Sequence, residues 1–267
     1  MKRLLSLSIV QRFGLQAGLL CGLGVAFVVA DAPEAVATGG TCRAEDECSF
    51  DKPNFMLILD YSSSMNSLFG SSTTQTRWDA AVEAIEALVA FQNGFLDENT
   101  HLALMRFGHD PDPSTPGTTI PVDENTNPTA PLVDGYRVDV PWYDPADVTN
   151  TPWFECNGIA ITDALNGILP PGQSPTAGIG TWTKNALDQT QLLIAESDAD
   201  HPADGGVGLP NGRYYGNIVI TDGLWSGPDG VTQPPAEDPN QTAADLFNNG
   251  GVPTYVVAVD LGGTGLV

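Results

Sequence analysis

Basic residues are scarce in this chain. Its 267 residues include 10 Lys and Arg against 33 Asp and Glu, which gives a formal net charge of −23. Binding to nucleic acid phosphates or to anionic membrane surfaces depends on clustered Lys and Arg, whereas the basic residues here are scattered beyond the extreme N-terminus. We therefore expect no nucleic acid partner, and no membrane contact beyond the export signal described below.

Histidine and cysteine are also rare, with three and four residues in the chain. The histidines, His101, His109 and His201, show no ligand spacing to one another or to a cysteine, which argues against a zinc site. The sequence also lacks a phosphate-cradling loop, a zincin helix and a complete nucleophile elbow. Because hydroxyls near a carboxylate make no catalytic triad without a placed histidine, we expect this chain not to be an enzyme.

Residues 1–37 have the pattern of a secretory signal peptide. A positively charged start precedes an apolar run over 15–30, and 35–37 (Ala-Val-Ala) form a small-x-small cleavage site. A rival cleavage site at 30–32 is weakened by the proline that follows it. A retained membrane anchor is the other interpretation, although the run is short for a full span. A lipid anchor at Cys21 is disfavoured because Leu occupies the position before it. The sequence thus predicts a secreted or cell-envelope protein.

Three cysteines follow the predicted signal, in a chain expected to reach an oxidising compartment. Cys42 and Cys48 would close a small loop inside a lead-in segment, 38–53, which would leave Cys156 unpaired. Alternatively, Cys156 pairs with one of the other two and ties the lead-in to the domain. Cysteine spacing does not choose between these pairings.

Strand-like and helix-like patterns alternate from residue 54 onward, within a predicted domain over 54–267. Short apolar runs predict strands at 55–59, 101–107, 136–142, 218–220 and 254–259. Apolar residues at three and four spacing predict helices at 77–95, 157–169, 176–196 and 242–249. This order predicts an α/β fold with an open, mostly parallel central sheet flanked by helices on both faces. A turn-rich loop insertion is expected over about 108–150.

The most informative residues follow the first predicted strand. Asp60, Ser62 and Ser64 place a carboxylate and two hydroxyls at alternate positions, just past the carboxyl end of a strand, where open α/β sheets bind ligands. Hard oxygen donors suit Mg²⁺, Mn²⁺ or Ca²⁺, and a site with few carboxylates matches Mg²⁺, which retains water ligands. The other interpretation is a Ser-rich turn whose Asp caps the next segment.

This segment resembles the von Willebrand factor type A (VWA) domain family, whose metal-ion-dependent adhesion site (MIDAS) has the pattern Asp-x-Ser-x-Ser. Asp60, Ser62 and Ser64 match that pattern, and the strand before them matches the family's central first strand. The family also has a Thr on a second loop and an Asp on a third, which Thr176 and Asp222 match best. These pieces occur in the family's order, and the resemblance covers about residues 54 to 260.

The resemblance implies an exported binding or adhesion module. Ser62, Ser64 and Thr176 would touch the ion, whereas Asp60 and Asp222 would act largely through water or switch to direct contact. An open coordination position would accept a carboxylate from a protein or cell-surface partner. An ion held by few carboxylates retains positive charge, so this binding should fail with a chelator.

Two features depart from the family. The chain stops just past the last predicted strand, where the family has another helix. Either the chain is a fragment of a longer protein, or the domain lacks its last covering helix, which would leave sheet surface exposed. The 108–150 segment is also longer than the usual connection. Two other functions stay open, namely a structural secreted or envelope protein whose metal site is merely stabilising, and a hydrolase in which Asp60 and Asp222 hold a water-activating ion. The hydrolase lacks an evident general base.

Overall fold

The computed structural model describes residues 52–91, 94–109, 135–144, 153–171, 180–202, 206 and 212–260. All of them belong to one unit, Thr38–Val267. The predicted signal peptide, Cys42, Cys48, Thr176 and most of the 108–150 insertion lie outside these residues. Within the described ranges, no helix combines the length and the apolar character needed to cross a bilayer.

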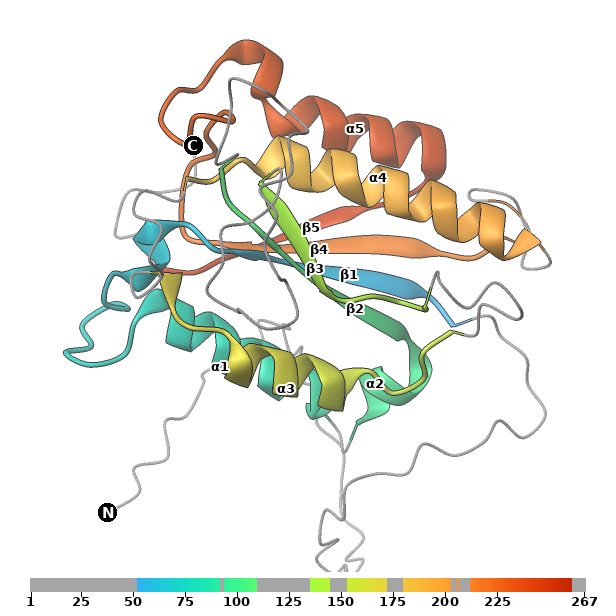
Figure 1. Ribbon diagram of the computed structural model, residues 1–267, viewed down its shortest axis with the longest axis horizontal. Helices are drawn as coiled ribbons and strands as arrows, with labels where there is room; N and C mark the ends of the chain where they lie inside the picture. The colour runs from blue at the N-terminus through green and yellow to red at the C-terminus, as the bar shows by residue number, and fades with distance from the viewer. Residues whose placement is uncertain are drawn as a thin grey trace, which may run out of the picture. The chain divides into compact units, whose positions relative to one another are not determined.

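Five strands form one sheet in the order β3-β2-β1-β4-β5 (Figure 1). They are β1 (Asn54–Asp60), β2 (His101–Phe107), β3 (Tyr136–Val140), β4 (Tyr215–Thr221) and β5 (Thr254–Ala258). Neighbouring pairs are parallel except for β3, which runs antiparallel to β2. The predicted α/β class, with an open and mostly parallel sheet, is confirmed.

Helices cover both faces of this sheet (Figure 1). One face carries α1 (Arg77–Val89), α2 (Phe95–Asn99) and α3 (Gly158–Gly167), and the other carries α4 (Thr183–Asp200) and α5 (Pro239–Gly250). Two short 3₁₀ helices, η1 (Ser63–Asn66) and η5 (Pro235–Glu237), lie in the connections. Because each face of the sheet has its own helical layer, the central strands must be apolar on both sides.

The core is divided by β1 into two apolar clusters. Leu57 and Leu59 pack in the cluster that includes Ile85 of α1, whereas Met56 and Ile58 belong to the cluster that includes Leu187 of α4. Successive side chains of a strand point to opposite faces, so a strand covered on both faces has no position for solvent-facing residues. This explains why the continuous apolar run at 55–59 correctly predicts a fully buried strand.

Two helix predictions are wrong in their extent. The helix predicted over 77–95 ends at Val89, and Gly94, with φ 91°, begins the separate helix α2. Glycine adopts this left-handed conformation without steric cost, which suits Gly94 to its place as the cap residue of α2. The helix predicted over 176–196 begins only at Thr183 and continues to Asp200. Its cap residue is Trp182, which forms no capping side-chain bond, so the usual sequence signal for a helix start is missing.

The edge strand β5 is less covered than β1. Tyr255, Val256 and Val257 are 53%, 61% and 45% exposed. Cys156, just before α3, is disulfide-bonded, and the cysteine that it bonds lies outside the described residues. The choice of partner among the remaining cysteines stays a prediction.

Candidate metal centre

Parallel pairing of β1 and β4 places two predicted site residues at one edge of the sheet. Asp60 is the last residue of β1, and Asp222 directly follows the last residue of β4, Thr221. The two strands pair in register up to Leu59 and Ile220, so their carboxyl ends lie side by side. This is the edge at which open α/β sheets bind ligands.

Four of the five predicted site residues are joined to one another by hydrogen bonds. Asp60 Oδ1 accepts the backbone N–H of Ser62 at 2.7 Å, and its Oδ2 accepts the Thr221 hydroxyl at 2.6 Å. The Oγ atoms of Ser62 and Ser64 are 2.8 Å apart, and Ser64 Oγ donates to Asp222 Oδ1 at 2.8 Å. The fifth residue, Thr176, lies outside the described residues.

The turn after β1 fixes the direction of the two serines. Ser62 caps η1, and its carbonyl accepts the N–H of Met65 at 3.1 Å. Tyr61 and Met65 are fully buried in the core on the α1 side of the sheet, and the Tyr61 hydroxyl donates to the carbonyl of Leu169 at 2.6 Å. These two buried anchors flank the serines on either side, which leaves Ser62 and Ser64 available to the polar group.

Burial dominates the electrostatics of Asp60. Desolvation raises the pKa of its carboxyl from 3.8 to about 6, although the hydrogen bonds from Thr221 and Ser62 oppose the shift. The nearby charge of Asp222 raises the pKa further. Two carboxylates in a buried place favour a compensating positive charge, which a bound cation or a basic side chain can supply.

Arg77 supplies such a charge, and the sequence reasoning missed it. Its Nη1 donates to Asp222 Oδ2 at 2.5 Å, and its Nε lies 3.7 Å from Asp260 Oδ2. Thr221 was missed as well, although it precedes Asp222 and bonds Asp60. The residue type and position of Thr221 in the Thr-Asp turn were a usable signal, whereas nothing in the sequence around Arg77 links it to a loop 145 residues away.

The donor set fits a hard divalent cation. When Mg²⁺ has octahedral ligands at about 2.0–2.1 Å, neighbouring oxygens are about 2.9 Å apart. The separations of 2.8 Å from Ser62 Oγ to Ser64 Oγ and from Ser64 Oγ to Asp222 Oδ1 are close to this value. In the part of the chain that the structure describes, no group of three or more His, Cys, Asp or Glu has an arrangement for holding a metal.

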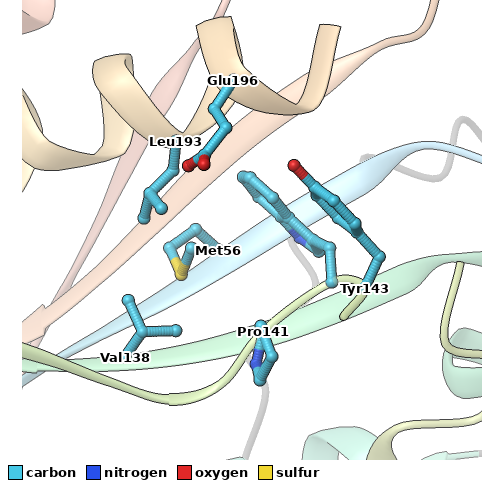
Figure 2. A pocket seen from close by; sticks show the side chains of 7 residues that line it. Met56, Val138, Pro141, Tyr143, Leu193 and Glu196 are labelled. Atoms are coloured by element: carbon cyan, nitrogen blue, oxygen red, sulfur yellow. The ribbon is translucent and has the colours of Figure 1, made fainter. Parts of the chain in front are cut away.

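A separate apolar cavity of about 40 Å³ lies between the sheet and α4 (Figure 2). Leu193 and Glu196 project from α4 toward Met56 of β1, and Val138 and Tyr143 are also among the lining residues. None of the predicted site residues lines it. Small-molecule pockets generally enclose about 300–1,000 Å³, so this cavity is too small for an organic substrate.

Together, the fold and the site describe an α/β protein with a cluster of hydroxyl and carboxylate oxygens at the carboxyl edge of its sheet. No family model matches the sequence, and no curated protein matches it.

Three solved structures of pilus proteins are similar to the chain at low sequence identity. The pilus adhesin SpaC from Lactobacillus rhamnosus GG is 14% identical, with a TM-score of 0.43 over 79% of this chain and 25% of that one. The adhesive tip pilin GBS104 from Group B Streptococcus agalactiae is 14% identical, with a TM-score of 0.32 over 67% and 30%. The pilus adhesin RrgA from Streptococcus pneumoniae is 16% identical, with a TM-score of 0.26 over 66% and 21%. This chain spans less than a third of each of those proteins.

Proposed function

We propose that this chain is an exported binding module, and not an enzyme, that holds a divalent cation at the sheet edge and uses it to engage an acidic group. The observation that supports the proposal most is the continuous contact of Ser62, Ser64 and Asp222 through their side-chain oxygens. The VWA resemblance adds the expected roles of Asp60 and Thr176 in a MIDAS. The similarity to pilus adhesins, at TM-scores below 0.5, is not part of this support.

The chemistry follows from the kinds of oxygen present. Ser62 and Ser64 would supply neutral hydroxyl oxygens and Asp222 one charged oxygen. Asp60 lies fully buried and orients Ser62 through the backbone N–H. A cation bound mainly by neutral ligands retains positive charge, which would attract a carboxylate on a protein or on a cell surface. Mg²⁺ or Mn²⁺ suits the few donors better than Ca²⁺, which takes about 6–8 oxygens.

Calorimetric titration of Mg²⁺ and Mn²⁺ into the full chain tests the metal site. We expect binding heat in the parent and its loss in Asp222→Ala and in Asp60→Ala. Asp245→Asn is the matched control, because it removes a half-buried carboxylate of α5 that accepts a hydrogen bond from Gln241 Nε2 at 2.9 Å and is not part of the site. A folded parent that releases no heat, or binding that Asp222→Ala leaves intact, would contradict the proposal.

A second experiment separates a binding module from a structural protein with a stabilising ion. The parent and Asp222→Ala are immobilised and exposed to cell-surface extract with Mg²⁺ or with EDTA, and free acetate is then added as a competing carboxylate. A binding module retains a partner that EDTA and acetate both release. If Mg²⁺ raises the melting temperature but no extract, from any source tried, yields a retained partner, the structural alternative is favoured.

A further inference from the structure

Arg77 brings a permanent positive charge into the candidate metal centre. Its Nη1 is 2.5 Å from Asp222 Oδ2, and the side chain of Asp222 is fully covered, whereas that of Arg77 is 19% exposed. A guanidinium stays protonated at every pH at which a protein is folded. Salt screens a covered pair of this kind much less than a surface pair.

The position of Arg77 is determined by its backbone as well as by its charge. Arg77 is the first residue of α1, directly after the cap residue Thr76, whose side chain and backbone form a reciprocal capping box with Asp79. The Arg77 N–H donates to the carbonyl of Ser67 at 2.9 Å. The N-terminus of a helix favours negative residues because of its dipole, so the helix itself gives no reason for an arginine here.

Arg77 and Ser64 divide the two oxygens of Asp222 between them. Oδ1 accepts from the Ser64 hydroxyl at 2.8 Å, and Oδ2 accepts from Arg77. On the other side of the guanidinium, Nε faces Asp260 Oδ2 at 3.7 Å, and the same oxygen accepts the N–H of Gly70 at 2.6 Å. Only Oδ1 of Asp222 thus faces the serine hydroxyls. The guanidinium at Oδ2 partly neutralises the negative charge of the Asp222 carboxylate.

We propose that Arg77 sets the charge of the metal site, weakening cation binding by engaging one oxygen of Asp222. This inference rests on the proposed function and specifies how the same site is regulated. Because a guanidinium withdraws negative charge from Asp222 and repels a nearby cation, the ion is held less tightly and retains more positive charge for an acidic partner. Arg77 is a positioning residue for Asp222 and supplies no ligand atom to the ion.

A purely structural role for Arg77 makes a different prediction. In that case the guanidinium only ties the loop after β4 to the residues after β5, through Asp222 and Asp260. Its removal would then lower stability and leave metal affinity unchanged or reduced. Metal affinity, measured apart from stability, distinguishes the two roles.

Manganese titration into four forms of the full chain provides this measurement. Arg77→Gln removes the charge, and Arg77→Lys retains it. Lys52→Gln removes one positive charge just before β1, at the end of the strand opposite to Asp60, where Lys52 pairs with the exposed Glu155. We expect Arg77→Gln to bind Mn²⁺ at least about tenfold more tightly, because a like charge within a few ångströms of the ion opposes binding about fivefold in bulk water and more strongly near a protein surface. Lys52→Gln is expected to stay within about twofold of the parent, because its charge is remote from the site. Arg77→Lys retains the positive charge and is expected to bind Mn²⁺ more nearly as the parent does than as Arg77→Gln does.

A second measurement on the parent does not depend on the folding of any variant. In a Mg²⁺ titration followed by NMR, the side-chain Nε–H of Arg77, identified by its absence from Arg77→Lys, should shift along the calorimetric binding curve. Equal or weaker Mn²⁺ binding by folded Arg77→Gln, or an Nε–H signal that does not respond to Mg²⁺ binding, overturns the inference while the metal site stands. Absence of binding in the parent and in Arg77→Gln alike overturns the proposed function itself.

Discussion

The hydroxyl of Ser64 donates a hydrogen bond to Oδ1 of Asp222 at 2.8 Å, although the two residues are 158 positions apart in the sequence. This bond joins the turn after β1 to the turn after β4. It depends on two strands that are adjacent only in the folded sheet. The predictions below test this contact and the elements that hold it in place.

Ser64→Ala should weaken Mg²⁺ and Mn²⁺ binding by about tenfold or more, a loss comparable to that caused by removing a supporting group of a metal site. Ser63→Ala is the matched control, because Ser63 lies between the two site serines in the same short helix and is exposed. Calorimetry on both variants gives the comparison. Equal affinity in Ser63→Ala and Ser64→Ala would show that the hydroxyl of Ser64 has no special role.

Asp139→Ala should destabilise the domain by about 3–5 kcal/mol, because it leaves a buried arginine unpaired. Arg106 is completely buried and donates to Asp139 from Nε at 2.6 Å and from Nη2 at 2.9 Å. Its guanidinium also lies 4.6 Å from the ring centre of Tyr61, beside the site. Urea denaturation measures the change in unfolding free energy.

Lys184→Gln is the control for Asp139→Ala. It breaks the more exposed ion pair with Asp188 on α4, and such pairs contribute about 0.3–0.5 kcal/mol. If both substitutions cost less than about 1 kcal/mol, the buried pair does not have the energetic role expected of it.

Thr76→Ala should cost about 1 kcal/mol of stability through loss of the capping box at the start of α1. Thr76 Oγ1 accepts the N–H of Asp79 at 3.1 Å, and Asp79 Oδ2 accepts the N–H of Thr76 at 2.9 Å. Thr73→Ala, at an exposed position in the preceding loop, should be close to neutral. Thermal unfolding in EDTA measures both, and equal melting temperatures would argue against the cap.

His101 should make stability depend on pH. Burial lowers its pKa below 6.5, an effect that Glu155 opposes through its charge and that Arg213 and Lys52 reinforce. The unfolded chain therefore binds more protons than the folded chain between the lowered folded pKa and 6.5, so stability rises with pH across that window and falls as the pH drops through it. Urea unfolding in EDTA at a series of pH values from about 5 to 8 should show a steeper rise for the parent than for His101→Gln. Identical slopes would remove His101 as the cause.

Much of the fold could be predicted because its signals are local. The apolar run before Asp60 specifies a strand that is covered on both faces, and the period of three and four residues specifies amphipathic helices. The limits of these predictions are also local in origin, because apolar spacing does not record where a helix ends. The first helix ends at Val89, before the predicted end at residue 95, and Trp182 begins α4 without a capping side chain.

In the candidate site, too, some features follow from the local sequence and others depend on the tertiary structure. The alternation of Asp60, Ser62 and Ser64 belongs to one turn, so the sequence by itself determined that a carboxylate and two hydroxyls follow the first strand. Only the tertiary structure decided that Arg77 lies against Asp222 and that Thr221 bonds Asp60. Those contacts depend on which strands are neighbours and on how α1 is placed against them, which are consequences of long-range pairing and packing of the whole core. No pattern within a short stretch of sequence records them.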